Sequence, residues 1–166
     1  MKKLPLGIQS IIKILKEDRV YIDKTGFAFE LMENGTHYFI SRPRRFGKSL
    51  FLKTLEEIFK GNRTLFKGFA IDTSNYDWKE YPVLSFDFAQ ISSSSFEKFE
   101  TCLSTELEKL ARLYKAPIEK PSIEFQLKLL VESLAKHNRV IVLIDERVLS
   151  SGFLHIVRKL WAAHPI

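Results

Sequence analysis

A short loop with glycine, lysine and serine in succession has the residue types that bind phosphate groups. Gly47, Lys48 and Ser49 follow the apolar residues 38–40 and precede a segment with helical periodicity. The glycine lets the backbone approach a phosphate, the lysine reaches the β and γ phosphates, and the serine hydroxyl is a magnesium ligand. Backbone amides at the start of the helix add further donors. The alternative for so short a tripeptide is an ordinary helix start with a solvated lysine.

The loop differs from the usual phosphate loop at its first position. Arg42 stands five residues before Gly47, where a first glycine is expected. A side chain there disfavours positive φ, so the chain must approach the loop differently, and the fixed φ of Pro43 offers one way. The residues that we predict to bind the nucleotide are Arg42, Pro43, Arg44, Arg45, Phe46, Gly47, Lys48, Ser49 and Leu50.

Two acids at the end of an apolar run form a second candidate motif. Residues 139–146 read Arg-Val-Ile-Val-Leu-Ile-Asp-Glu, which is typical of a strand buried on both faces of a parallel sheet. Such a strand delivers its acids to the carboxyl edge of the sheet, where ligands bind in open α/β folds. Asp145 would hold magnesium with the Ser49 hydroxyl, and Glu146 would act as general base on the attacking water. The alternative is that both acids only end the strand and begin a polar turn.

The elements expected around these motifs alternate between strand and helix. Strands are expected at residues 38–40 and 82–88 and before the two acids. Helices are expected at residues 7–16, 24–33, 49–60, 96–114 and 122–136. In the helix after the loop, the apolar residues that share a face are Leu52, Leu55, Ile58 and Phe59. The alternation predicts an α/β fold with a three-layer, P-loop NTPase-type parallel sheet.

The motifs together resemble the AAA-ATPase-like family of predicted P-loop ATPases, many of which carry a restriction-endonuclease-like nuclease domain farther along the chain. The segments that carry the resemblance are residues 5–9, 21–25, 41–49, 65–68 and 142–146. The loop at 41–49 is the most specific of them, and arginine at position 42 is normal for the family. The resemblance implies binding of ATP and Mg²⁺. It also implies DNA, a nuclease or further copies of the chain as possible partners.

The resemblance stops after Glu146. The family usually continues with a tyrosine, an aspartate and a proline, whereas residues 147–152 are Arg-Val-Leu-Ser-Ser-Gly. We therefore expect the N-terminal part of an AAA-ATPase-like nucleotide-binding domain at 1–146, a divergent tail at 147–166, and a sheet that is incomplete at its C-terminal end. Two functions follow. One is an ATP-binding, magnesium-dependent ATPase domain, and the alternative is a truncated, catalytically impaired remnant or a regulatory module that works through protein contacts.

Four further residues each have two possible roles. Three of them precede the loop, and one lies near a strand end. Tyr21, Asp23 and Lys24 belong to the family pattern and would contact adenine or ribose, or instead fix the start of the next helix. Asp87 lies near the end of an expected strand and would either join the site or pair with a lysine.

Composition narrows the class of protein. The chain has 166 residues, of which 45% are hydrophobic, and these suffice for one core. No apolar run reaches the length of a membrane span, and no signal peptide follows Met1, so we expect a cytoplasmic protein without membrane association. The net charge of +6 leaves DNA binding open, although lysines interspersed with glutamates are typical of solvated helix faces. The four histidines lack ligand spacing, so we predict no structural zinc.

Overall fold

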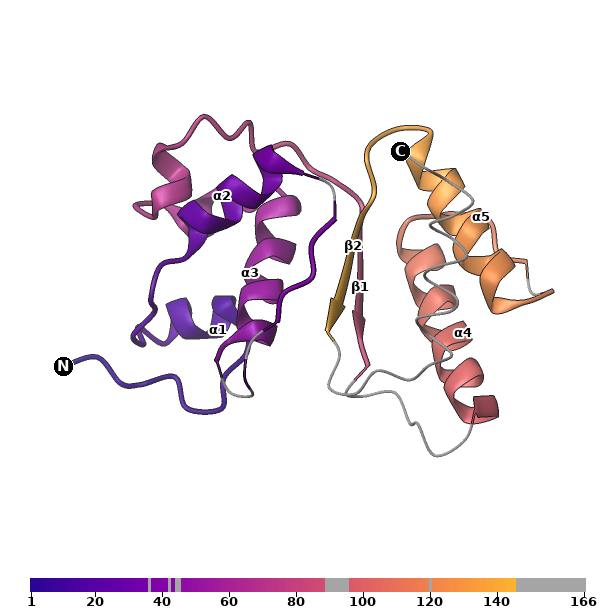
Figure 1. Ribbon diagram of the computed structural model, residues 1–166, viewed down its shortest axis with the longest axis horizontal. Helices are drawn as coiled ribbons and strands as arrows, with labels where there is room; N and C mark the ends of the chain where they lie inside the picture. Colours follow the sequence, from indigo (N-terminus) through magenta and orange to yellow (C-terminus); the bar gives the residue numbers. More distant parts are fainter. Residues whose placement is uncertain (36, 42, 44–45, 89–95, 120, 146–166) are drawn as a thin grey trace. The chain divides into compact units, whose positions relative to one another are not determined.

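The computed structural model describes residues 1–35, 37–41, 43, 46–88, 96–119 and 121–145. The chain divides into two compact units, Met1–Tyr81 and Pro82–Ile166, and each is described by itself (Figure 1). The expected tail at 147–166 and the general base Glu146 lie outside the described residues.

The first unit is built from helices. Its α-helices are α1 (Ile11–Lys16), α2 (Thr25–Asn34) and α3 (Lys48–Phe59), and two 3₁₀ helices follow, η1 (Arg63–Phe66) and η2 (Ala70–Thr73). The helix predicted at 7–16 begins later, at Ile11, because Ser10 caps it by accepting a hydrogen bond from the Lys13 amide. Gly7 has a φ of 70°, which is not helical.

The strand predicted at residues 38–40 does not form. Residues 37–41 have no strand pairing, and Phe39 is 83% exposed and Tyr38 48% exposed. An apolar triplet becomes a strand only where a neighbouring strand completes its hydrogen bonds. Among the described residues of the first unit there is no strand at all, so the segment before the loop has none to pair with inside its own unit.

The helix after the loop forms where the sequence predicts it, and its buried residues include part of the apolar face named from the sequence. The residues of α3 that are buried are Phe51, Thr54, Leu55 and Ile58. Leu55 and Ile58 of the predicted apolar face are among them, whereas Leu52 and Phe59 are half-buried. The buried face therefore includes a polar residue, Thr54.

The second unit contains the two strands that the structure describes. Strand β1 (Val83–Asp87) is followed by helices α4 (Phe96–Leu113) and α5 (Ile123–Ala135) and then by strand β2 (Ile141–Asp145). The strands pair in parallel, with Val83 opposite Ile141 and Asp87 opposite Asp145. Ser122 caps α5 by accepting from the Phe125 amide. The α/β class is thus confirmed, with a parallel sheet of two strands in the described part of the chain.

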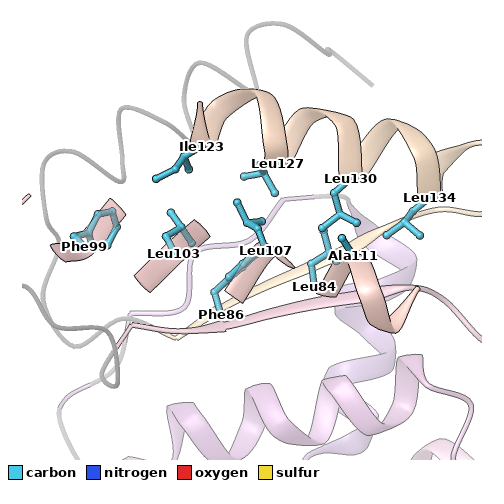
Figure 2. Packing of buried hydrophobic residues seen from close by; sticks show 10 residues of the cluster. All are labelled: Leu84, Phe86, Phe99, Leu103, Leu107, Ala111, Ile123, Leu127, Leu130 and Leu134. Carbon is cyan, nitrogen blue, oxygen red and sulfur yellow. The ribbon is translucent and has the colours of Figure 1, made fainter. Parts of the chain in front are cut away.

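Helices α4 and α5 cover one face of this small sheet (Figure 2). Alternate residues of β1 point toward the helices, as the two-residue period of a strand requires. The buried residues of this core are Leu84, Phe86, Phe99, Leu103, Leu107, Ala111, Ile123, Leu127, Leu130 and Leu134. Successive residues of a strand face opposite sides of the sheet. Asp87 follows the core residue Phe86 on β1, and Asp145 follows Ile144, which packs against the core, on β2; both aspartates therefore belong to the opposite face.

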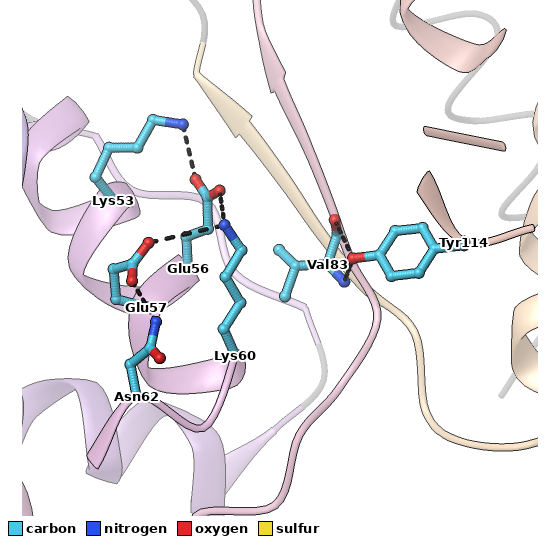
Figure 3. A network of polar contacts seen from close by, with 7 residues as sticks. All are labelled: Lys53, Glu56, Glu57, Lys60, Asn62, Val83 and Tyr114. Carbon is cyan, nitrogen blue, oxygen red and sulfur yellow. Dashed lines mark hydrogen bonds and ion pairs between the residues drawn. The ribbon is translucent and has the colours of Figure 1, made fainter. Parts of the chain in front are cut away.

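A tyrosine after α4 fixes the beginning of β1. The Tyr114 hydroxyl accepts a hydrogen bond from the Val83 amide at 2.8 Å and donates one to the Val83 carbonyl at 3.1 Å (Figure 3). These Val83 groups point away from β2, since the Ile141 amide bonds to the carbonyl of the preceding residue, Pro82. The Tyr114 hydroxyl therefore provides hydrogen-bond partners for the Val83 backbone groups on the edge of β1 that faces away from β2.

Candidate functional site

A glycine in the left-handed backbone conformation leads into α3. Gly47 immediately precedes the helix, with φ 77° and ψ 21° in the left-handed region. The Phe51 amide donates to the Gly47 carbonyl at 2.9 Å, which is a hydrogen bond of the helical type. Before the helix, the Phe46 amide donates to the Pro43 carbonyl at 3.3 Å. A Cβ at Gly47 would meet nothing within 4 Å. Glycine is therefore favoured here by the backbone conformation and not by crowding.

The first turn of α3 suits an anion. Gly47, which directly precedes the helix, offers no side chain to cap it, and the first turn contains no acidic residue. The amides there carry the positive end of the helix dipole. Lys48, Ser49 and Leu50 are half-buried in this turn, and Phe46 before them is 63% exposed. Amides, a lysine and a hydroxyl are thus brought together within one turn, whereas Arg42, Arg44 and Arg45 lie outside the described residues.

Farther along α3, charged residues pair within the helix. Glu56 accepts hydrogen bonds from Lys53 at 2.7 Å and from Lys60 at 2.6 Å (Figure 3). Burial by itself raises the pKa of Glu56, but the hydrogen bonds from the two lysines outweigh it, and the pKa is lowered from its ordinary value. Asn62 donates to Glu57 one turn away. These contacts stabilise the helix and hold the Lys53 side chain against Glu56.

The acid-bearing strand ends as the sequence predicts. Asp145 is the last residue of β2 and is half-buried, and its backbone carbonyl accepts a hydrogen bond from the Phe88 amide at 3.0 Å. Its register partner on β1 is Asp87. Register partners on parallel strands project from the same face of a sheet. The structure thus places two carboxylates side by side at the carboxyl edge, a relation that could not be derived from their separation in the sequence.

Comparison with known proteins places these two motifs in one family. The sequence model of the AAA-ATPase-like family, described as a predicted AAA-ATPase, matches residues 5–147. The chain belongs to this family. The matched range includes the loop at 41–49, Asp145 and Glu146.

One relative of this AAA-ATPase-like chain is a much longer protein. It is the "Uncharacterized protein in vnfD 5′region" of Azotobacter chroococcum mcd 1, which is 57% identical over 89 residues. The alignment covers 52% of this chain and 17% of the relative, so the chain spans only a small part of the relative's length. No solved structure matches the chain.

The structure assigns a clear role to Asp23 of the AAA-ATPase-like chain. One carboxylate oxygen accepts from the Thr25 amide at 2.8 Å and from the Thr25 hydroxyl at 2.7 Å, and the other accepts from the Ala70 amide at 2.8 Å. The Thr25 hydroxyl in turn accepts from the Ile71 amide at 3.1 Å. Asp23 therefore fixes the start of α2 and ties it to η2, which favours the structural alternative over contact with adenine or ribose.

The spacing of Asp23 and Thr25 carried a signal for this role. An aspartate that bonds the backbone two residues later forms a local turn of a common kind. The long-range part, the bond to Ala70, joins residues far apart in the sequence and carries no local signal. Lys24 precedes α2 without making a side-chain cap.

The described residues form neither a cluster of metal ligands nor a membrane-spanning helix. In the described ranges, no group of three or more histidine, cysteine, aspartate or glutamate side chains is arranged to hold a metal ion. Likewise, none of the helices in the described part of the chain is both long and apolar enough to cross a membrane. Magnesium in nucleotide sites is bound by one or two protein groups together with phosphates and water, and does not require such a group.

Proposed function

We propose that this chain is an ATP-binding module and a magnesium-dependent ATPase domain. The observation that carries the proposal is the start of α3, where left-handed Gly47 leads into a first turn that contains Lys48 and Ser49 and no acidic residue. Membership of the AAA-ATPase-like family supports it. The Gly47–Leu50 backbone would bind phosphate oxygens, Lys48 would neutralise the β and γ phosphates, and the arginines at 42, 44 and 45 would add positive charge.

In this proposal Asp145 binds the metal and Glu146 takes part in the reaction. Magnesium would be held by Asp145 and by the Ser49 hydroxyl, and would neutralise charge on the phosphates. Glu146 would orient the attacking water and accept its proton. The position of Asp145 at the carboxyl end of a parallel strand supports its part, because ligands bind at that edge in open α/β sheets.

The proposal includes a larger sheet than the two strands described. Parallel sheets occur almost only where both faces are covered, whereas α4 and α5 cover one face of β1 and β2 within their unit. A three-layer, P-loop-type sheet would meet this requirement. Association with DNA or a nuclease domain, assembly with further copies of the chain, and a cytoplasmic location stay predictions from the sequence.

Calorimetry of the purified chain with Mg-ATP and Mg-GTP tests the binding step. Saturable binding of Mg-ATP is expected, and Lys48→Ala should abolish it. Lys53→Ala is the matched control, because Lys53 lies on the same helix but pairs with Glu56. A folded wild type without nucleotide binding would refute the proposal, and so would equal effects of the two substitutions.

The second candidate function is a regulatory module that works through protein contacts. Three large apolar side chains near the loop favour it, since Tyr38, Phe39 and Phe46 are all well exposed. Glu146→Gln separates the two candidates. If the chain is an ATPase, this variant should bind Mg-ATP and lose hydrolysis; if the wild type binds nucleotide without turnover, the regulatory candidate is favoured.

A further inference from the structure

A relay of hydroxyl groups connects Tyr21 to the first turn of α3. Thr54 is fully buried, and its hydroxyl donates to the Leu50 carbonyl at 2.9 Å. The Tyr21 hydroxyl oxygen lies 3.2 Å from the same Thr54 oxygen. Thr54 has a single hydroxyl hydrogen, which the Leu50 carbonyl takes, so Tyr21 must be the donor to Thr54. The direction of the relay is therefore Tyr21 to Thr54 to Leu50.

The relay ends at the part of α3 that would hold the phosphates. Leu50 directly follows Ser49 in the first turn of α3. Its backbone carbonyl accepts a hydrogen bond from the Thr54 hydroxyl. Back-bonding of this kind by threonine adjusts the local bend of a helix. A change at Thr54 is thus transmitted to the turn that contains Lys48 and Ser49.

The other end of the relay is anchored independently of α3. The Tyr21 ring packs edge-on against Phe69, with ring centroids 5.5 Å apart. Two residues later, Asp23 bonds to the Ala70 amide. Burial raises the pKa of the Tyr21 phenol, so the hydroxyl keeps the proton that it donates throughout the neutral range. Tyr21 is held in place by the segment before η2, and it can therefore act as a fixed point for α3.

We propose that Tyr21 and Thr54 are positioning residues for the phosphate site. They do not contact the nucleotide; they hold the first turn of α3 in the orientation in which its amides, Lys48 and Ser49 converge on the phosphates. This inference rests on the proposed function. It also gives Tyr21 a role different from adenine or ribose contact.

Three variants test the relay by calorimetry with Mg-ATP, well below the melting temperature of each. Thr54→Val keeps the side-chain shape and removes the Thr54 hydroxyl. Tyr21→Phe keeps the ring and removes the Tyr21 hydroxyl, and Thr54→Ser keeps a hydroxyl at position 54. The first two should each weaken binding about tenfold, as for one lost hydrogen bond in a buried network, and Thr54→Ser should restore most of the affinity. The double variant should lose no more than either single one.

The control is Thr105→Val in α4. Thr105 makes the same kind of back-bond, to the Thr101 carbonyl at 2.9 Å, but lies in the other unit. Its removal should leave the affinity unchanged. If wild type binds Mg-ATP and both relay variants bind equally well, the inference is overturned while the proposed function stands. If wild type binds no nucleotide, the proposed function itself fails. Should Thr54→Val not fold, Tyr21→Phe decides the matter alone, since it keeps the packed ring.

Discussion

Asp87 and Asp145 are register partners at the carboxyl ends of the parallel strands β1 and β2. Neighbouring strands lie about 5 Å apart, so the two side chains project close together from one face of the sheet. If magnesium binds here as proposed, both carboxylates act on the ion, and the effect of each falls with its distance from it.

The first prediction follows from this pairing. Asp145→Asn should remove most of the magnesium dependence of ATP binding, because Asp145 is the proposed ligand. Asp87→Asn should weaken magnesium binding by a smaller factor, through the loss of a nearby charge. Titration of Mg²⁺ at fixed ATP measures both effects. A larger loss for Asp87→Asn would reverse the assignment of the two acids.

The second prediction concerns Gly47. Alanine at this position meets no atom within 4 Å, but it would have to adopt a φ of 77°. The conformational cost is about 1 kcal/mol of unfolding free energy. Gly68→Ala is a matched control, because Gly68 has a φ of 83° and equally open surroundings. Urea unfolding should show similar losses for both variants, whereas only Gly47→Ala should lower ATP affinity. Equal affinity in the two variants would argue against a phosphate loop at Gly47.

The third prediction is a pH dependence of stability from Asp23. Burial alone would raise its pKa, but hydrogen bonds from Ala70 and Thr25 outweigh burial and lower the pKa from the ordinary value of 3.8. A carboxyl with a lowered pKa stabilises the folded chain above its ordinary pKa, and this contribution is lost as the pH falls through the lowered value. Asp23→Asn should therefore destabilise the chain at pH 7 and have a smaller effect near pH 3. Urea unfolding at both pH values tests this, and a constant difference would contradict it.

The fourth prediction concerns Tyr114. Its hydroxyl bonds both polar backbone groups of Val83, so Tyr114→Phe should cost about 1–2 kcal/mol of unfolding free energy. Hydrogen exchange should show faster opening of the Val83 amide than of the amides within the β1–β2 pairing. Unchanged protection at Val83 would show that water replaces the tyrosine without cost.

Local signals explain what could be predicted from the sequence. The starts of α3 and α5 and the positions of β1 and β2 follow from a glycine turn, a serine cap and apolar runs that end in polar residues. Whether residues 38–40 form a strand depends on a partner strand, which no local pattern reveals. Thr54 is polar and nevertheless buried, because its hydroxyl bonds to Leu50 and Tyr21, and the second of these contacts comes from a distant segment that no local pattern reveals. The pairing of Asp87 with Asp145 depends in the same way on strand register.

The most direct test of phosphate binding at α3 is an amide NMR titration of the ¹⁵N-labelled chain with Mg-ATP. The proposal predicts large, saturable shifts for the amides of Gly47, Lys48, Ser49 and Leu50, and their loss in Lys48→Ala. If ATP leaves these four amides unchanged while the chain is folded, the first turn of α3 is not a nucleotide site and the proposed function is wrong.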